Sequence, residues 1–143
     1  MSDTNHGPFT AAVFNKYLDQ EQLMATKCLQ CNSLFIPPRE ICPECLDQQM
    51  MWVPLSGNGK VAAFTVIYVG PTFMNTQGYD RNNPYITGIV EFEEGLHISA
   101  RLLGFNALEP ETVEVGTPVK VDFVRVNNVE HPFTQLAFRS LQS

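Results

Sequence analysis

Positive charge is scarce in this sequence. Its 143 residues include nine Lys and Arg against 15 Asp and Glu, which gives a formal net charge of −6 at pH 7. The cationic residues are scattered and form no basic run. Neutralisation of backbone phosphates drives much of nucleic-acid binding, so an acidic chain without a basic patch is a poor candidate for that role. We therefore expect no nucleic-acid partner.

Long apolar runs are lacking as well. No stretch approaches the roughly 20 apolar residues of a membrane-spanning helix. The opening residues, MSDTNHGPF, have neither the basic region nor the apolar region of a signal peptide. We therefore expect a cytoplasmic protein with no membrane association.

The cysteines are few, but they fall into two pairs. Cys28 and Cys31 form one C-x-x-C pair, ten residues follow, and Cys42 and Cys45 form the second pair. In a reducing cytoplasm such pairs indicate a metal site rather than disulfides. Four protein thiolates complete the tetrahedral shell of Zn²⁺ and leave no position for water or substrate. We predict a structural zinc site; a single iron in a rubredoxin-like site and four free or redox-active thiols are the alternatives.

A helix is predicted from Ala11 to Ala25, with Thr10 as its N-cap. Phe14, Tyr17 and Leu18 recur at helical spacing and give it an apolar stripe. This stripe either packs within its own domain or is offered to a partner, and the pattern leaves both readings open.

The rest of the chain is typical of β structure. Strands are predicted at residues 61–69, 85–92, 96–103, 118–126 and 134–138, with a helical turn at 107–112 between the third and the fourth. Five strands with a short helix in that position have the layout of an OB-fold barrel. We predict a mainly β protein in two domains: an N-terminal helix with a rubredoxin-like zinc ribbon in residues 1–50, and a five-stranded OB-fold barrel in residues 51–143. The connection over residues 70–83 is long, which indicates a functional or a disordered segment.

Candidate catalytic groups are few. The histidines are His6 in the polar start, His97 in a predicted strand and His131 in a polar turn. The cysteines are committed to the predicted metal, and residues 57–59 (Gly-Asn-Gly) are read as a turn rather than as a phosphate-binding loop. Catalysis needs a nucleophile, a base or an open metal position. We predict that the chain has no catalytic residues of its own.

Several segments together resemble one known family. They are the ribbon segment ATKCLQCNSLFIPPREICPECL, the SGNGKV segment before the first barrel strand, the hairpin PYITGIVEFEEG, and the later PVKVDF and LAFR. From about Phe14 to Arg139 the chain resembles the zinc-ribbon and OB-fold family labelled as a domain of unknown function 35. One departure is Asn32, which stands where a glycine is usual after the first cysteine pair. Asparagine tolerates a positive φ, so we expect the turn to survive.

The resemblance implies an accessory role in acyl-CoA metabolism. Members of this family form stable complexes with thiolases and thiolase-like enzymes, with hot-dog-fold hydratases or with aldolases that act on CoA thioesters. Within the family, the chain resembles small subunits of two-component thiolases, of the kind that cleaves benzoylsuccinyl-CoA in anaerobic toluene degradation. We therefore expect a hetero-oligomer in which this chain stabilises a thiolase-like catalytic subunit and caps its substrate entrance. The alternatives are a subunit of another CoA-thioester enzyme (hydratase, aldolase or synthase), a free-standing acyl-CoA-binding protein, and a binder of single-stranded nucleic acid.

Interfaces favour exposed aromatic and Met side chains, which suggests where a partner would bind. The predicted contact residues come from the helix, the second half of the ribbon and the long barrel loop: Phe14, Tyr17, Leu18, Ile36, Arg39, Phe73, Met74 and Tyr79. Arg39 is also a candidate for pairing with a phosphate of a CoA thioester near the interface, because its planar fork suits bidentate contact. Local packing is the alternative for each of these residues.

Overall fold

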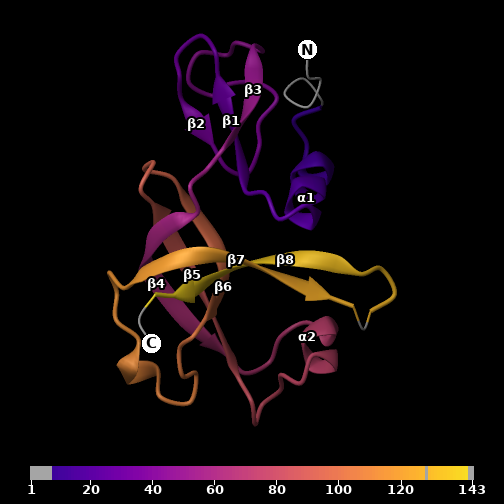
Figure 1. Cartoon of the computed structure of the whole chain (residues 1–143), viewed down its shortest axis with the longest axis vertical. Helices are drawn as coiled ribbons and strands as arrows, with labels where there is room; N and C mark the ends of the chain where they lie inside the picture. Colours follow the sequence, from indigo (N-terminus) through magenta and orange to yellow (C-terminus); the bar gives the residue numbers. More distant parts are fainter. Residues whose placement is uncertain (1–7, 128, 142–143) are drawn as a thin grey trace. The chain divides into compact units, whose positions relative to one another are not determined.

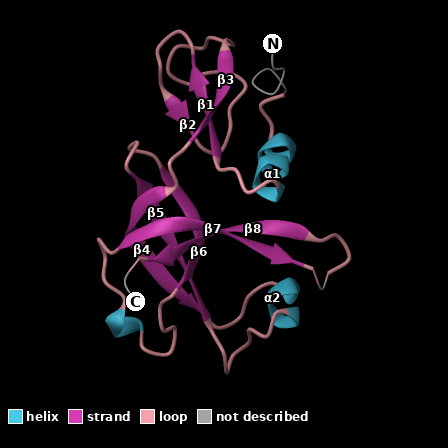
Figure 2. Ribbon diagram, viewed as in Figure 1, coloured by secondary structure: helices cyan, strands magenta, loops and turns pink. Residues whose placement is uncertain are grey.

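The structure is a computed structural model of the chain, and it describes residues 8–127 and 129–141. The chain forms two compact units, one ending at Ser56 and the other beginning at Gly57. Figure 1 and Figure 2 show a helix with a small sheet in the first unit and a barrel in the second. Across the described residues, no helix combines the length and the apolar character that crossing a bilayer requires.

The first unit is a helix followed by a three-stranded antiparallel sheet. Its elements are α1 (Ala11–Asp19), β1 (Met24–Cys28), β2 (Leu34–Phe35) and β3 (Met50–Pro54). The strand order is β2-β1-β3, so β1 is the central strand and pairs with both neighbours (Figure 1).

Helix α1 begins where the sequence predicts and ends earlier. The hydroxyl of Thr10 accepts a hydrogen bond from the backbone N–H of Val13 at 3.3 Å, which confirms the N-cap. The helix stops at Asp19, and Glu21 has a φ of 60°. The prediction of helix as far as Ala25 was therefore wrong. Residues 24–28 instead hydrogen-bond as the central strand of the sheet, where four of the five side chains are buried.

Trp52 is the largest fully buried side chain of the first unit, at 1% exposure. Tyr17 of α1 meets its ring edge-on at a centroid distance of 5.2 Å, and Phe9 lies 5.7 Å from it in a tilted arrangement. Aromatic side chains bury large areas and prefer such offset or edge-on geometry. The helix is thus packed onto the sheet that holds the cysteines.

The second unit is a closed five-stranded barrel, which confirms the OB-fold prediction. Its elements are β4 (Asn58–Ile67), α2 (Thr72–Thr76), β5 (Tyr85–Phe92), β6 (His97–Leu103), a 3₁₀ turn (Pro110–Thr112), β7 (Pro118–Val126) and β8 (Phe133–Ser140). The order around the barrel is β4-β5-β6-β8-β7, and pairing between β4 and β7 closes it. Strands β6 and β8 run parallel, whereas every other barrel pair is antiparallel.

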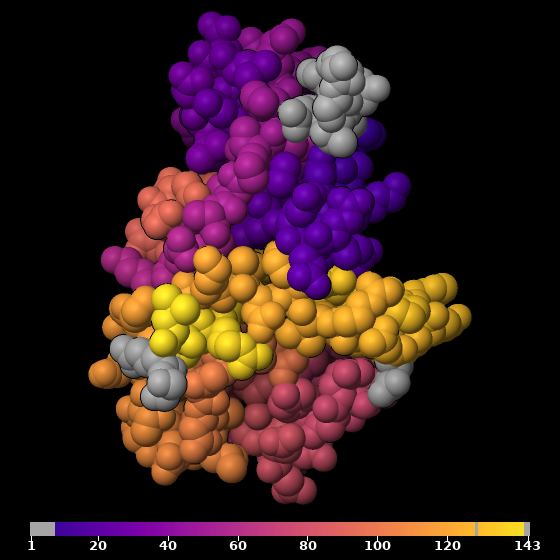
Figure 3. All heavy atoms as spheres, in the orientation of Figure 1, coloured from indigo at the N-terminus to yellow at the C-terminus, as the bar shows by residue number. Residues whose placement is uncertain are grey.

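The barrel interior is filled by apolar side chains from several strands. Val61, Val90, Val119 and Phe138 are fully buried, and the rings of Phe92 and Phe138 lie 5.5 Å apart. On the face shown in Figure 3, atoms of β7 and β8 (orange to yellow) form a continuous band over the barrel. This unit therefore has a core of its own.

The long connection between β4 and β5 is partly ordered as helix. Helix α2 occupies residues 72–76, and the Met74 side chain is only 1% exposed. Phe73 packs edge-on against Phe133 at 5.2 Å. This short helix was not predictable from the sequence, because five residues are too few to show a helical period.

Candidate metal centre

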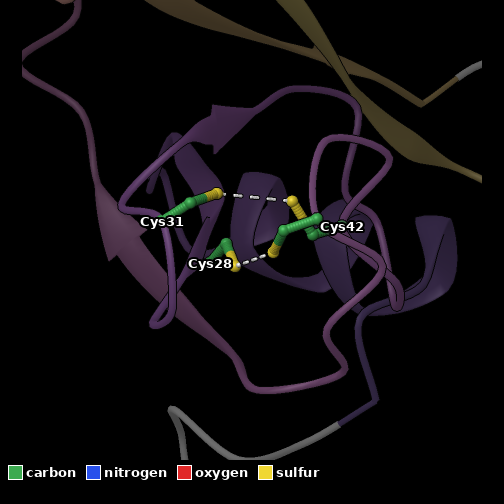
Figure 4. Close-up of side chains that lie close together, drawn as sticks. Cys28, Cys31 and Cys42 are labelled. Carbon is green, nitrogen blue, oxygen red and sulfur yellow. Dashed lines mark hydrogen bonds between the residues drawn. The ribbon is translucent and has the colours of Figure 1, made fainter.

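The four cysteine thiols of the first unit lie together. Cys28 is the last residue of β1, Cys31 lies in the turn before β2, and Cys42 and Cys45 lie in the loop between β2 and β3. The Sγ atoms of Cys28 and Cys45 are 3.5 Å apart, and those of Cys31 and Cys42 are 3.6 Å apart. All four Sγ atoms lie within 4.8 Å of one another. Figure 4 shows Cys28, Cys31 and Cys42 turned toward a common centre between the two loops.

The two cysteine pairs have the same backbone hydrogen-bond pattern. In the first, the N–H of Cys28 donates to the carbonyl of Ser33 and the N–H of Asn32 donates to the carbonyl of Cys28, at 2.9 and 2.8 Å. In the second, Cys42 donates to Asp47 and Leu46 donates to Cys42, again at 2.9 and 2.8 Å. The repeated pattern turns both cysteines of each pair toward the same point.

A left-handed residue completes each of these turns. Asn32 has a φ of 66° and Leu46 a φ of 65°, each four residues after the first cysteine of its pair. The expectation that Asn32 tolerates this conformation is in keeping with the structure. Sequence reasoning missed Leu46, because leucine carries no signal for a positive φ.

The spacing of the thiols fits a tetrahedral metal ion. Four sulfurs at about 2.3 Å from a central Zn²⁺ would lie about 3.8 Å from one another. The Cys28–Cys45 and Cys31–Cys42 sulfur separations, 3.5 and 3.6 Å, are close to that value and far longer than the roughly 2.05 Å of a disulfide bond. The donor set therefore suits one ion held by four thiolates.

The thiols are too close to ionise independently. Hydrogen bonds from the side chain and then the backbone of Ser33 lower the pKa of Cys31 to about 6. For Cys45 a backbone hydrogen bond from Asp47 acts in the lowering direction, but desolvation and proton sharing with the other thiols raise the pKa to about 12. The lowered pKa of Cys31 thus comes mainly from Ser33, whereas the raised pKa of Cys45 comes from desolvation and from protons shared among the thiols. A bound divalent cation would favour the thiolate form of all four.

Two residues that support the cysteine loops were not predicted from the sequence. The thiol of Cys31 lies 3.3 Å from the hydroxyl of Ser33. Thr26 is fully buried on β1; its hydroxyl accepts a hydrogen bond from the backbone N–H of Arg39 at 3.1 Å and donates to the carbonyl of Phe35 at 3.4 Å. Thr26 thereby ties the loop that carries Arg39 to the central strand.

The predicted partner contacts in the first unit differ in exposure. The side chains of Phe14, Tyr17 and Leu18 are at most 9% exposed. In this conformation the apolar stripe of the helix is therefore packed within the chain. Ile36 is half-buried, whereas Arg39 is exposed. Contact of these residues with a partner stays a prediction.

The predicted contacts in the barrel unit are also largely packed. Phe73 and Tyr79 are half-buried and Met74 is buried. The Tyr79 ring lies under the guanidinium of Arg101, with 4.4 Å between the guanidinium carbon and the ring centroid. Sequence reasoning did not single out Arg101, since nothing in a strand pattern marks an arginine as buried. Partner contact through this loop stays a prediction.

Comparison with known proteins identifies the family. Residues 16–50 match the family described as "ChsH2, rubredoxin-like zinc ribbon domain", and residues 52–124 match "ChsH2, C-terminal OB-fold domain". The chain belongs to the ChsH2 family. Both halves of the fold prediction and the resemblance to the domain of unknown function 35 are thereby confirmed.

Three of the proteins similar to this ChsH2-family chain show the range of their names. It is 32% identical to a "DUF35 domain-containing scaffold protein" of Methanocaldococcus jannaschii, over 73% of this chain and 69% of that protein. It is 30% identical to "Benzoylsuccinyl-CoA thiolase subunit BbsA" of Geobacter metallireducens, over 83% of this chain and 75% of that protein. Among solved structures it is similar to the "Ltp2-ChsH2(DUF35) aldolase", with a TM-score of 0.74, 26% identity, and coverage of 90% of this chain and 92% of that one.

Proposed function

We propose that this chain is a non-catalytic accessory subunit of an enzyme complex that acts on CoA thioesters, with a thiolase-like catalytic subunit as its partner. The observation that carries the proposal is the similarity to BbsA, a named thiolase subunit, across both the ribbon and the barrel. The "scaffold protein" relatives support an assembly role in the same direction. Cleavage of benzoylsuccinyl-CoA is the specific reaction that this relative suggests.

An aldolase complex is the second candidate. The specific observation in its favour is the fold similarity to a chain of the Ltp2-ChsH2 aldolase, which covers nine tenths of the present chain. Thiolases and aldolases of this kind both act on CoA thioesters, so an accessory subunit of the same fold would suit either enzyme. The identity of the captured partner distinguishes the two.

Within the described residues, the thiols and the His97 imidazole lie in settings that support a non-catalytic role. All four thiols belong to the metal cluster, and a four-thiolate shell has no open position for substrate. His97 lies exposed on β6 with its Nε2 atom 4.0 Å from a carboxylate oxygen of Glu91. An exposed histidine beside a single exposed carboxylate is a common surface arrangement.

We propose Zn²⁺ as the ion and stabilisation as its role. Zinc accepts four thiolates without redox chemistry, and the thiol spacing fits its bond lengths. The ion would join the turn after β1 to the loop before β3, which lie 11 to 17 residues apart in the chain. A unit of this size buries little apolar surface, so a metal crosslink is a physically reasonable source of stability.

Apolar side chains exposed beside the cysteines support partner binding. Leu29 and Ile41 are 50% exposed and Leu46 is 75% exposed, and each is adjacent in sequence to a metal-binding cysteine. Interfaces bury apolar side chains of this kind at their centres. We propose that this set, here called the knuckle leucines and isoleucine, contacts the catalytic subunit, with Arg39 at the rim.

Purification from the native cells tests the proposal. The tagged chain is passed through a sizing column, and the proteins that remain bound in stoichiometric amounts are identified by mass spectrometry. The purified partner is then assayed for CoA-thioester cleavage with and without this chain. A thiolase in fixed ratio, with activity that depends on the chain, is the expected result. A chain that elutes alone, or one that retains full CoA-thioester activity by itself, would contradict the accessory role.

A further inference from the structure

The barrel unit contains a cavity that the accessory role does not use. It has a volume of about 260 Å³ and lies between the loop that precedes β5, the end of β6 and the loop that follows β6. Tyr79, Asn83 and Tyr85 line one part of it, and Arg101, Leu103 and Phe105 line another. We call it the Arg101 cavity. Its volume suits a small organic molecule rather than a single water.

Arg101 is buried in an unusual setting. The side chain is on β6, and the residue is 7% exposed. The Tyr79 ring covers the guanidinium at 4.4 Å and the Tyr85 ring lies at 6.0 Å. A guanidinium has five N–H donors, and in the described part of the chain this one makes a single hydrogen bond, from Nη1 to Gln135 at 3.4 Å. Its Nε atom is buried without an acceptor.

The positive charge of Arg101 has no counterion in the described part of the chain. No carboxylate there lies within 4.0 Å of it, and the residues that line the cavity include no Asp or Glu. A buried charge is costly unless it is paired and hydrogen-bonded. Cation–π contact with Tyr79 offsets part of that cost but accepts no hydrogen bond along the guanidinium plane.

The positive charge of Arg101 affects the ionisation of Tyr85, which also lines the cavity. Desolvation raises the pKa of the Tyr85 phenol, and the positive charge of Arg101 opposes that rise. A positive group in a partly enclosed, carboxylate-free cavity attracts anions, and guanidinium matches the planar geometry of an oxyanion.

We propose that the Arg101 cavity binds the oxyanion group of a small organic molecule, a carboxylate or a phosphate ester, with Arg101 as its counterion. The apolar walls formed by Leu103 and Phe105 would contact the body of the ligand. The amide nitrogen of Asn83 donates to the carbonyl of Gly78 at 2.8 Å and has a second N–H for a neutral hydrogen bond to the ligand. This site stands independently of the accessory role, because it rests on residues of the barrel unit alone.

Titration of the full-length, zinc-loaded chain tests this site. Benzoate and inorganic phosphate are added separately while backbone amide signals are followed by NMR, and benzamide serves as the neutral match of benzoate. Shifts confined to residues 79–86 and 101–108 with benzoate or phosphate, and absent with benzamide, are expected. A response to benzoate alone would identify a carboxylate site, and a response to phosphate alone a phosphate site; either supports an oxyanion site.

Matched variants connect the response to the guanidinium. Arg101→Gln is expected to weaken the binding by roughly 10- to 100-fold, the range for loss of a charge-assisted hydrogen bond. Arg81→Gln removes the same charge from an exposed position of the preceding loop and is expected to leave binding unchanged. If Arg101→Gln does not fold, Arg101→Lys keeps the charge without the planar fork and is expected to bind several-fold more weakly than the unaltered chain. No shift with any anion at about 10 mM, equal shifts with benzamide, or unchanged binding in Arg101→Gln or Arg101→Lys would overturn the proposal.

Discussion

At the scale of single residues, Leu46 carries a conformation that its side chain disfavours. Its φ of 65° places it in the left-handed region, and 75% of its surface is exposed. Left-handed backbone costs an L-residue roughly 1–2 kcal/mol. The residue holds this conformation because its N–H closes the turn around Cys42.

Replacement of this residue by glycine should stabilise the metal site. Leu46→Gly relieves about 1–2 kcal/mol of backbone strain. Glycine also has more conformational freedom in the unfolded chain, which offsets about 0.4–1 kcal/mol of that gain. The expected net increase is roughly 0.5–1 kcal/mol in the free energy of unfolding, measured by denaturant titration of the zinc-loaded protein.

Leu29→Gly is the matched control for Leu46→Gly. Leu29 is also exposed beside a metal-binding cysteine, but its φ is not positive. Glycine there brings only the entropic loss, about 0.5–1 kcal/mol of destabilisation. Equal effects of the two substitutions would show that strain at Leu46 is negligible.

At the scale of secondary-structure elements, β1 supports the second cysteine loop through one side chain. Thr26→Val keeps the shape of the side chain but leaves the N–H of Arg39 without its acceptor. An unsatisfied donor costs about 1–3 kcal/mol, so we expect a loss of that size in the free energy of unfolding of the zinc-loaded protein. Thr65→Val on an exposed position of β4 is the control, with an expected change of about 0.5 kcal/mol or less. A similar loss in both variants would show that the hydrogen bonds of the Thr26 hydroxyl are not its cause.

The barrel strands were predictable because their pattern is local. Residues 85–92 and 118–126 coincide with β5 and β7, since β-branched and aromatic side chains mark each strand along its length. The cysteine cluster was equally predictable, because the spacing of the four cysteines in the sequence is enough to indicate a shared metal site. The end of α1 was not, because Met24 and Ala25 fit a helix as well as a strand until β3 provides the hydrogen bonds. Arg101 was missed for a related reason: its burial depends on Tyr79 and Gln135, which are distant in sequence.

The knuckle leucines and isoleucine give the element-scale test of partner binding. The double substitution Leu29→Ser and Ile41→Ser removes two half-exposed apolar side chains. If they lie at the centre of the interface, the dissociation constant for the catalytic subunit should rise about tenfold or more. Val115→Ser removes an exposed apolar side chain from the barrel unit and should leave the affinity unchanged. Biolayer interferometry with the purified partner measures both, and equal affinities would move the interface elsewhere.

At the scale of the whole molecule, the two units have different sources of stability. In the first unit two of the cysteines, Cys28 and Cys42, are part of a buried cluster with Met50, so we expect this unit to need its metal, whereas the barrel has an apolar core without cysteine. Removal of zinc by a strong chelator should therefore abolish hydrogen-exchange protection in β1 and β3 and preserve it in β4 to β8. Exchange measured by mass spectrometry separates the two units peptide by peptide.

Restoration of zinc provides the control for this experiment. Protection of β1 and β3 should return on addition of one equivalent of Zn²⁺, whereas Cys42→Ser should remain unprotected. Protection that survives complete metal removal would contradict a structural role for the ion. Simultaneous loss in both units would show that they unfold as one.

The order of the barrel strands also has a consequence during synthesis on the ribosome. Strand β8 is translated last, and in the finished barrel it lies between β6 and β7. The other four strands are therefore synthesised before the strand that joins β6 to β7. Until residues 133–140 emerge, β6 and β7 present unpaired backbone edges, the feature by which nascent chains associate wrongly. The cysteine loops, complete by residue 47, can already have captured their ion by then. A ribosome that stalls shortly before β8 would thus carry a finished ribbon attached to a barrel that is open along one seam.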